Sequence, residues 1–293
     1  MGHSTLCELI KPVCDALWNR LKDEVIPKYD EEFWRYQSKG FEMRCNFPHA
    51  IGAVDGKHVN LQAPPNSGTY FHNYKGFFSI VLLAIAGFDY HFTYVNIGGY
   101  GSQCDSQLFV DSAFYNLLQK KEFKLPPAEK LPNDEGGEAM PYFFLGDCAF
   151  RHTEQVQKGF PGRGGNDREK IYNYRLSSAR RCVENAFGIL TQRWGIYDRR
   201  ITLSPEKVDS CVRATVVLHN YLSKTNDAIT ARVLQDGFDV REELRNARGL
   251  APLQATRQRN PCARAKEVWE YLANYFQNKG SVHWQRQAAN LED

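Results

Sequence analysis

Asp55 ends an apolar run in the stretch IGAVDGKH, where an acidic side chain loses solvation unless something nearby compensates its charge. It could lie in a solvated turn, because Asp-Gly is a common turn pair, in a buried salt bridge, or beside a metal ion. Asp147 raises the same question at the end of YFFLGDCAF, and Glu184 lies in the amphipathic stretch VENAFGIL. Taken singly, these acids have ordinary alternatives: a turn, a strand-end cap, and a weak surface pair with Arg180 or Arg181.

Taken together, three carboxylates could support phosphodiester hydrolysis. That reaction needs an activated nucleophile and a stabilised leaving oxygen, and two divalent ions about 3.5–4 Å apart provide both. Mg²⁺ prefers oxygen ligands and keeps several waters, so two or three carboxylates suffice to hold such a pair. Without ions the carboxylates would repel one another and the pKa of at least one would rise. A shared site for Asp55, Asp147 and Glu184 therefore predicts bound Mg²⁺ or Mn²⁺.

Other residues near these acids have weaker claims. Asp105 is a competing acid, but its position three residues after Ser102 favours a helix-capping role over metal ligation. Lys57 and His58 follow Asp55 on a predicted strand and point to opposite faces, so at most one shares the face of the site, as a phosphate or substrate contact. The histidines show no His-Glu-x-x-His spacing, which argues against a zinc hydrolase. His219 reads as a packed helix histidine.

The eight cysteines are scattered, with no Cys-x-x-Cys pair, and we expect reduced thiols packed as small apolar residues.

The chain has 293 residues, of which 42% are hydrophobic, enough for a large globular core. No stretch approaches a membrane span, and charged residues near the start argue against a signal peptide, so we expect a soluble intracellular protein.

Hydrophobic periodicity predicts an α/β chain. Three runs rich in β-branched and aromatic residues favour an antiparallel meander, a fourth strand ends in Asp147, and a later helix carries Glu184. The expected strands are 50–62, 77–89, 91–99 and 142–150, and the expected helices are 5–24, one opening at Ser102, 177–198, 204–223 and 263–276. The segment 157–170 is expected to be a glycine-rich loop. This order is that of the ribonuclease-H-like fold; the adjacency of the first and fourth strands is implied by that resemblance alone.

Charge is uneven along the chain, which carries a net +3. Residues 1–150 hold 13 Lys and Arg against 18 Asp and Glu, whereas residues 151–293 hold 24 against 16. Residues 163–200 form a basic strip with aromatic residues that suits contacts to the DNA backbone, although a solvated helix face is the alternative. The candidate DNA contacts are Lys170, Arg175, Arg180, Arg181 and Arg193.

Several long motifs resemble the Harbinger family of DDE transposases and the nucleases derived from them. They are FPHAIGAVDGKHV, PPNSGTYFHNYKGFFSIVLLAIAG, GYGSQCDS, YFFLGDCAF, NYRLSSARRCVENAFGIL, VVLHNYL and YFQNKGSVHWQ. The resemblance implies that Asp55, Asp147 and Glu184 are the catalytic acids, with Asp55 bridging two Mg²⁺ or Mn²⁺ ions and each of the others holding one. It also implies a DNA substrate, a nuclear location and a Myb-like helper protein, and a homo-oligomer is a further expectation.

The same resemblance divides the chain into three parts. Residues 1–46 are expected to be a helical remnant of a truncated helix-turn-helix region, 47–225 the ribonuclease-H-like nuclease domain, and 226–293 a C-terminal basic loop and helix. Arg151 and His152 replace the residues usual in the family after the second acid. The alternative function is a catalytically silent DNA-associated or adaptor protein that retains the fold.

Overall fold

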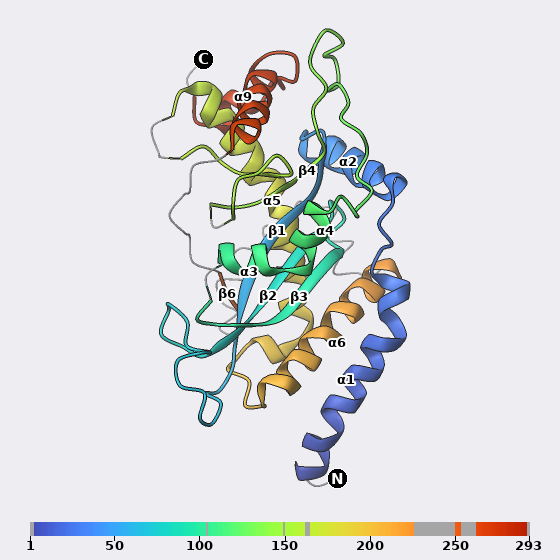
Figure 1. Ribbon diagram of the computed structural model, residues 1–293, viewed down its shortest axis with the longest axis vertical. Helices are drawn as coiled ribbons and strands as arrows, with labels where there is room; N and C mark the ends of the chain where they lie inside the picture. Colours follow the sequence, from blue (N-terminus) through green and yellow to red (C-terminus); the bar gives the residue numbers. More distant parts are fainter. Residues whose placement is uncertain are drawn as a thin grey trace.

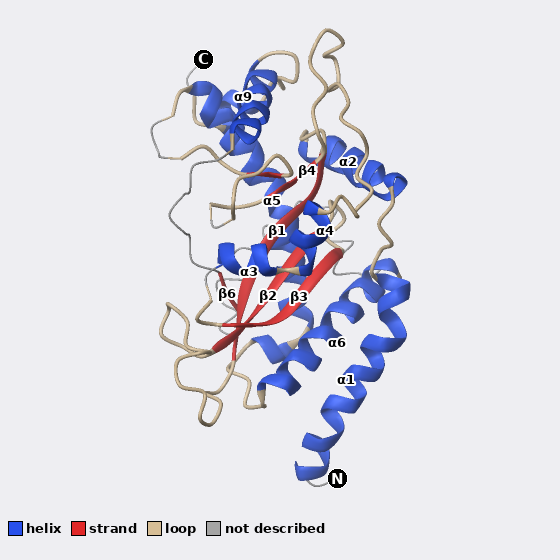
Figure 2. Cartoon of the chain, viewed as in Figure 1, coloured by secondary structure: helices blue, strands red, loops and turns tan. Residues whose placement is uncertain are grey.

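The computed structural model describes residues 3–103, 105–148, 150–161, 165–225, 250–252 and 262–291. Within these ranges six strands form one sheet in the order β3-β2-β1-β4-β5, with β6 also paired to β1 (Figures 1 and 2). The strands are β1 Ala50–Asn60, β2 Ser79–Ala86, β3 Phe92–Tyr100, β4 Phe143–Leu145, β5 Val156–Gln157 and β6 Leu250–Pro252. The helices are α1 His3–Val25, α2 Glu31–Cys45, α3 Asp105–Asp111, α4 Ala113–Gln119, α5 Asp167–Arg193, α6 Pro205–Lys224, α9 Ala263–Gln277 and α10 Gln285–Ala288.

The sheet confirms the ribonuclease-H-like expectation. β1, β2 and β3 form the antiparallel meander, and β4 lies parallel to β1 on its other side. Every residue of β2 is buried, because helices cover both faces of this central strand, and this explains its unbroken apolar sequence. The fourth strand is shorter than expected, since β4 ends at Leu145 and leaves Asp147 in the connection that follows.

Two hydrophobic cores lie on opposite faces of the sheet. On one face Val54 and Phe144 pack with Phe114 of α4, and α3 and α4 are seen in front of the sheet in Figure 1. On the other face Ala53 and Leu145 belong to the larger core, which contains the predicted apolar stripe of α5 and residues of α6 and α9. The helix that carries Glu184 is thus fixed against the strand that carries Asp55.

Helix boundaries differ from expectation at both ends of α5, which ends at Arg193 and not at 198, and in the segment after Ser102. α5 begins ten residues earlier than predicted, at Asp167, because Asn166 caps it by accepting from the Glu169 N–H at 3.0 Å. The single helix expected after Ser102 is wrong: Ser112 divides it into α3 and α4. Its hydroxyl donates to the Phe109 carbonyl and accepts from the Tyr115 N–H, so it ends one helix and caps the next.

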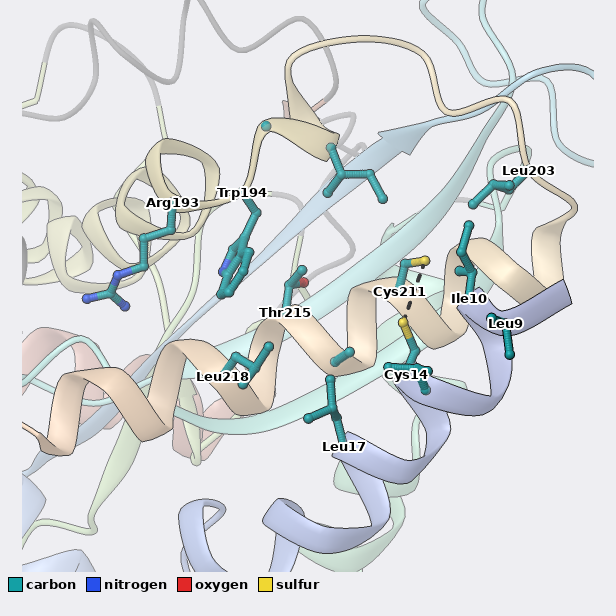
Figure 3. Close-up of a pocket in the computed structure, with 14 residues that line it drawn as sticks. Leu9, Ile10, Cys14, Leu17, Arg193, Trp194, Leu203, Cys211, Thr215 and Leu218 are labelled. Atoms are coloured by element: carbon teal, nitrogen blue, oxygen red, sulfur yellow. Dashed lines mark hydrogen bonds between the residues drawn. The ribbon is translucent and has the colours of Figure 1, made fainter. Parts of the chain in front are cut away.

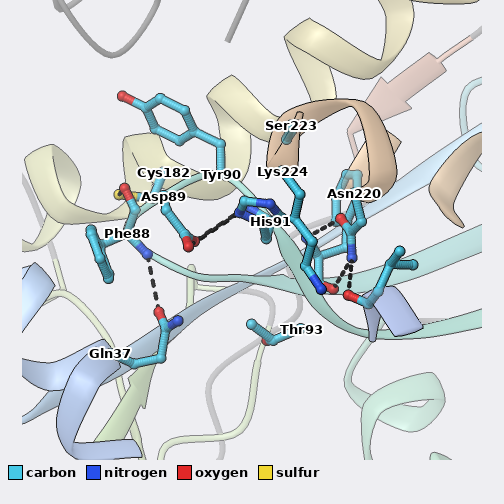
Figure 4. Close-up of polar contacts among 12 residues, drawn as sticks. Gln37, Phe88, Asp89, Tyr90, His91, Thr93, Cys182, Asn220, Ser223 and Lys224 are labelled. Carbon is cyan, nitrogen blue, oxygen red and sulfur yellow. Dashed lines mark hydrogen bonds and ion pairs between the residues drawn. The ribbon is translucent and has the colours of Figure 1, made fainter. Parts of the chain in front are cut away.

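The first helix, α1, joins the sheet through α6, whereas α2 contacts β1 directly. α1 was expected, α2 was not, and α1 packs along α6 (Figure 1). Asn220 of α6 exchanges hydrogen bonds with the backbone of Phe92 in β3 and also donates to the Val25 carbonyl at the end of α1 (Figure 4). One buried amide therefore fastens an edge strand and the first helix to the same point.

An apolar cavity of about 530 Å³ lies between α1, α6 and the turn after α5 (Figure 3). Cys14 and Cys211 meet in its wall with their sulfurs 3.9 Å apart, and all cysteines in the described ranges are free thiols. Cys148 and Cys262 are exposed, which corrects the expectation that the cysteines pack as apolar residues. No helix in the described ranges is long and apolar enough to cross a membrane.

The C-terminal helix packs against α5. The rings of Phe160 and Trp269 stack at 3.8 Å, and Phe276 packs against Tyr172 with ring centroids 6.0 Å apart. Much of the predicted basic loop after residue 225 lies outside the described residues.

Candidate active site

Asp55 lies in the middle of β1 and is 4% exposed. The strand changes its neighbour here, because β4 pairs with β1 as far as Ala53 and β6 pairs with it from Lys57. The Lys57 ammonium donates to the Asp55 carboxylate at 2.6 Å, and both side chains are buried. Of the three environments that the sequence left open for Asp55, the structure shows the buried salt bridge.

This ion pair faces helix α5. Side chains alternate along a strand, so residues 55 and 57 share the face of Ala53, which belongs to the same core as Phe187. Lys57 Nζ lies 5.4 Å from the centroid of the Phe187 ring, a favourable position for a cation. Glu184 precedes Phe187 by about one helical turn and is partly buried. The third acid therefore lies on α5 next to the ring that covers the pair.

Asp147 lies near the same edge of β1. Leu145 of β4 is the parallel partner of Ala53, so Asp147 and Asp55 each follow that pair by two residues. Asp147 is partly exposed and lies beyond the end of β4. Two acids that are far apart in the sequence thus lie the same number of residues beyond one strand pair.

A buried lysine lies close to Asp147. Lys158 follows β5, is 4% exposed, and donates to the Phe150 carbonyl at 3.1 Å. Burial lowers the pKa of Lys158, and the nearby Asp147 and Cys148 side chains oppose this effect. Sequence reasoning missed Lys158, because β5 has only two residues and gives no periodic signal.

The acids do not form a ready-made metal cluster. Among the side chains that the structure describes, no three His, Cys, Asp or Glu residues are grouped so that they could hold an ion. The donor chemistry nevertheless suits a divalent ion, because a cation stabilises a buried ionised carboxylate and carboxylate oxygens are the ligands Mg²⁺ prefers. The cation that Asp55 meets here is the Lys57 ammonium.

Sequence comparison places this arrangement in a known family. The profile of the DDE superfamily endonucleases matches residues 54–220, more than half of the chain. The chain belongs to the DDE superfamily endonuclease family. A relative, Protein ALP1-like from Arabidopsis thaliana, is 27% identical over 191 residues, which are 64% of this chain and 46% of the relative. The chain therefore spans about half the length of that relative. No solved structure matches this chain.

Lys57 and His58, the residues expected to support the site of this DDE family member, lie on opposite faces of β1. Lys57 lies on the face of Asp55, whereas His58 points to the other side, where its Nδ1 is 2.9 Å from the Ser79 hydroxyl. Burial, helped by the positive charge of Lys75, lowers the pKa of His58 to about 4. Asp105 begins helix α3, and its side chain lies outside the described part of the structure.

The basic strip of the DDE domain requires one correction. Arg175, expected to contact DNA, is 2% exposed; it donates to the Gly280 carbonyl at 2.7 Å and stacks over Phe276. Burial lowers its pKa to about 10. Arg175 therefore fastens α5 to the C-terminal region and is not available to a surface ligand.

The other candidate DNA contacts differ in exposure. Lys170 is exposed, and Arg180 and Arg181 are partly exposed, with Arg181 donating to the Ser178 hydroxyl at 2.7 Å. Arg193 is partly buried and donates to the carbonyl of His219. Lys170, Arg180 and Arg181 remain predicted DNA contacts, whereas Arg193 is positioned mainly to join α5 to α6.

Proposed function

We propose that this chain is a nuclease domain that hydrolyses DNA phosphodiester bonds with two Mg²⁺ or Mn²⁺ ions. Asp55, Asp147 and Glu184 would hold the ions. The proposal rests mainly on Asp55, a buried carboxylate on the central strand of a DDE-family domain, at the edge where β4 ends and beneath the helix that bears Glu184. A carboxylate that stays ionised when buried at this point requires a cation beside it.

The residues of the chain would act in distinct ways. When bound, the ions would activate the attacking water and stabilise the leaving oxygen. Lys57 would be displaced from Asp55 as the ions bind, and its ammonium would then be free to donate to phosphate oxygens, where charge-assisted hydrogen bonds are strong. Lys158 would balance the charge of Asp147 from the side of β5.

Substitution of the acids tests this proposal. We expect Asp55→Asn, Asp147→Asn and Glu184→Gln each to abolish Mg²⁺- or Mn²⁺-dependent nicking of supercoiled DNA while leaving circular dichroism spectra unchanged. Asp111→Asn, at an exposed acid of α3, is the matched control and should cleave normally. Asp105→Asn tests the competing acid. Cleavage by Asp55→Asn at the wild-type rate would discard the assignment.

A catalytically silent DNA-associated or adaptor protein is the second candidate. The observation in its favour is that Asp55 is already neutralised by Lys57 and that the described residues include no assembled three-acid group. Titration with Mn²⁺ separates the candidates: ion binding to the folded state raises the melting temperature by mass action, and a silent scaffold would not respond.

The finer expectations from the family resemblance belong to the same proposal. They are strand transfer after cleavage, a nuclear location, a Myb-like helper protein and assembly into a homo-oligomer. Fluorescence microscopy of the tagged chain, with and without the helper, tests the location, and light scattering tests the assembly.

A further inference from the structure

Exposed aromatic side chains lie together at the end of the sheet where β1 ends. Tyr70 and Tyr74 lie on the loop between β1 and β2, and Tyr100 is the last residue of β3; they are 67%, 46% and 46% exposed. The rings of Tyr70 and Tyr100 are 5.7 Å apart. We refer to Tyr70, Tyr74, Lys75 and Tyr100 as the tyrosine patch; its loop lies at the lower end of the view in Figure 1.

Buried polar residues hold the loop of the tyrosine patch in place. The Asn73 side-chain oxygen accepts from the Lys75 N–H at 2.9 Å and the Phe77 N–H at 3.3 Å, and its amide nitrogen donates to the Ser79 hydroxyl. Ser79 in turn bonds His58 of β1. Asn73, Ser79 and His58 are each 3% exposed or less, and such buried groups are hydrogen-bonded in stable structures. The loop is therefore ordered, although its aromatic side chains remain exposed.

The tyrosine patch packs against β1 beyond the position of Asp55. The Tyr74 ring lies 5.9 Å from the ring of His58, which follows Asp55 by three residues on β1. Lys75 Nζ lies 5.7 Å from the centroid of the Tyr74 ring. Burial lowers the pKa of Lys75, and the positive charge of Lys57 lowers it further. A lysine and exposed aromatic rings thus lie together on the loop that follows the strand carrying Asp55.

We propose that the tyrosine patch binds unpaired DNA nucleotides that extend from a duplex held by this domain. The tyrosine rings would stack on the bases, which is sequence-tolerant because every base has a π-face, and Lys75 would contact a backbone phosphate. An ordered loop makes such stacking favourable, since little conformational entropy is lost on binding. This inference rests on the proposed nuclease function of the same domain.

Binding to two DNAs in EDTA tests the inference without cleavage. Fluorescence anisotropy would compare a blunt duplex with the same duplex carrying a short single-stranded overhang. We expect Tyr74→Ala and Tyr70→Ala each to weaken binding of the overhang DNA roughly 5- to 150-fold, and binding of the blunt duplex less than about 2-fold. Tyr74→Phe, which keeps the ring, should bind as wild type. Tyr36→Ala, at an exposed tyrosine of α2, is the control.

Each outcome of these binding measurements either supports or overturns the inference. Equal weakening for both DNAs, no weakening, or equal loss in Tyr74→Ala and Tyr74→Phe would overturn the inference, provided that melting curves show the variants folded. Lys75→Gln should lower the slope of log affinity against log salt by about one. If the wild type cleaves DNA but the patch variants bind normally, the patch assignment alone fails. If the wild type does not cleave but the variants lose overhang binding, the nuclease proposal fails and the single-strand surface stands.

Discussion

Replacing Lys57 by methionine should destabilise the metal-free protein by roughly 3–5 kcal/mol. Methionine matches the length of the lysine stem and removes only the charged end. The substitution leaves Asp55, 4% exposed, without the ammonium that lies 2.6 Å from its carboxylate. Loss of the cation over the Phe187 ring adds to the effect. For a domain of this size such a loss lowers the melting temperature by about 10 °C.

A double-mutant cycle isolates the interaction between the two side chains. Asp55→Asn alone leaves the lysine charge buried without its carboxylate, so it should also be costly, whereas Asp55→Asn/Lys57→Met removes both charges and should recover much of the loss. We expect a coupling energy of about 3 kcal/mol from urea unfolding followed by circular dichroism in EDTA. Lys75→Met is the matched control, because Lys75 is more exposed, and should cost less than about 1 kcal/mol.

Addition of Mn²⁺ extends the same measurement. If the ion takes the position of the ammonium, it should stabilise Lys57→Met more than the wild type, since nothing has to be displaced. A Lys57→Met protein within about 1 kcal/mol of wild type in EDTA, or a coupling energy near zero, would refute the reasoning that Asp55 depends on this lysine.

Two further predictions concern stability. Burial lowers the pKa of both His58 and His152 from 6.5 to about 4, so the unfolded state binds more protons between these values. The stability should be constant above about pH 6.5 and fall as the pH drops to 4, by roughly 3 kcal/mol for each histidine; urea titrations at several pH values should show a shallower fall for His152→Gln. A methyl group added in Gly40→Ala would overlap the Phe88 ring, so this variant should lose roughly 1–3 kcal/mol, and thermal unfolding as stable as wild type would contradict the packing.

Local sequence patterns predicted most of the helices and strands but not all of their boundaries. The antiparallel meander was predictable because β1, β2 and β3 are apolar runs separated by turn residues, and α6 because Ser204 and Pro205 mark its start. The break at Ser112 was not predictable from periodicity, since it depends on a hydroxyl that serves two helices at once. The adjacency of β1 and β4 is a long-range pairing that came only through the resemblance.

The candidate site, too, was only partly predictable from the sequence. The contact between Asp55 and Lys57 follows from their spacing, because residues two apart on a strand share a face. The role of Arg175 was misjudged because charge along a helix does not reveal which face its neighbours cover, and α5 turns this residue toward the C-terminal region. The β4–β5 pairing brings Lys158 within the electrostatic influence of Asp147, which only the tertiary structure reveals.

The division of the β1 edge between β4 and β6 bears on how this protein can be dissected. β6 comes from residues 250–252, far along the chain from the strand that it completes. A fragment ending at residue 225 would leave backbone amides and carbonyls of residues 57–59 bare, and a bare strand edge recruits strands from other molecules. Such a fragment would tend to self-associate through the segment that neutralises Asp55, so the tail belongs to the minimal folding unit.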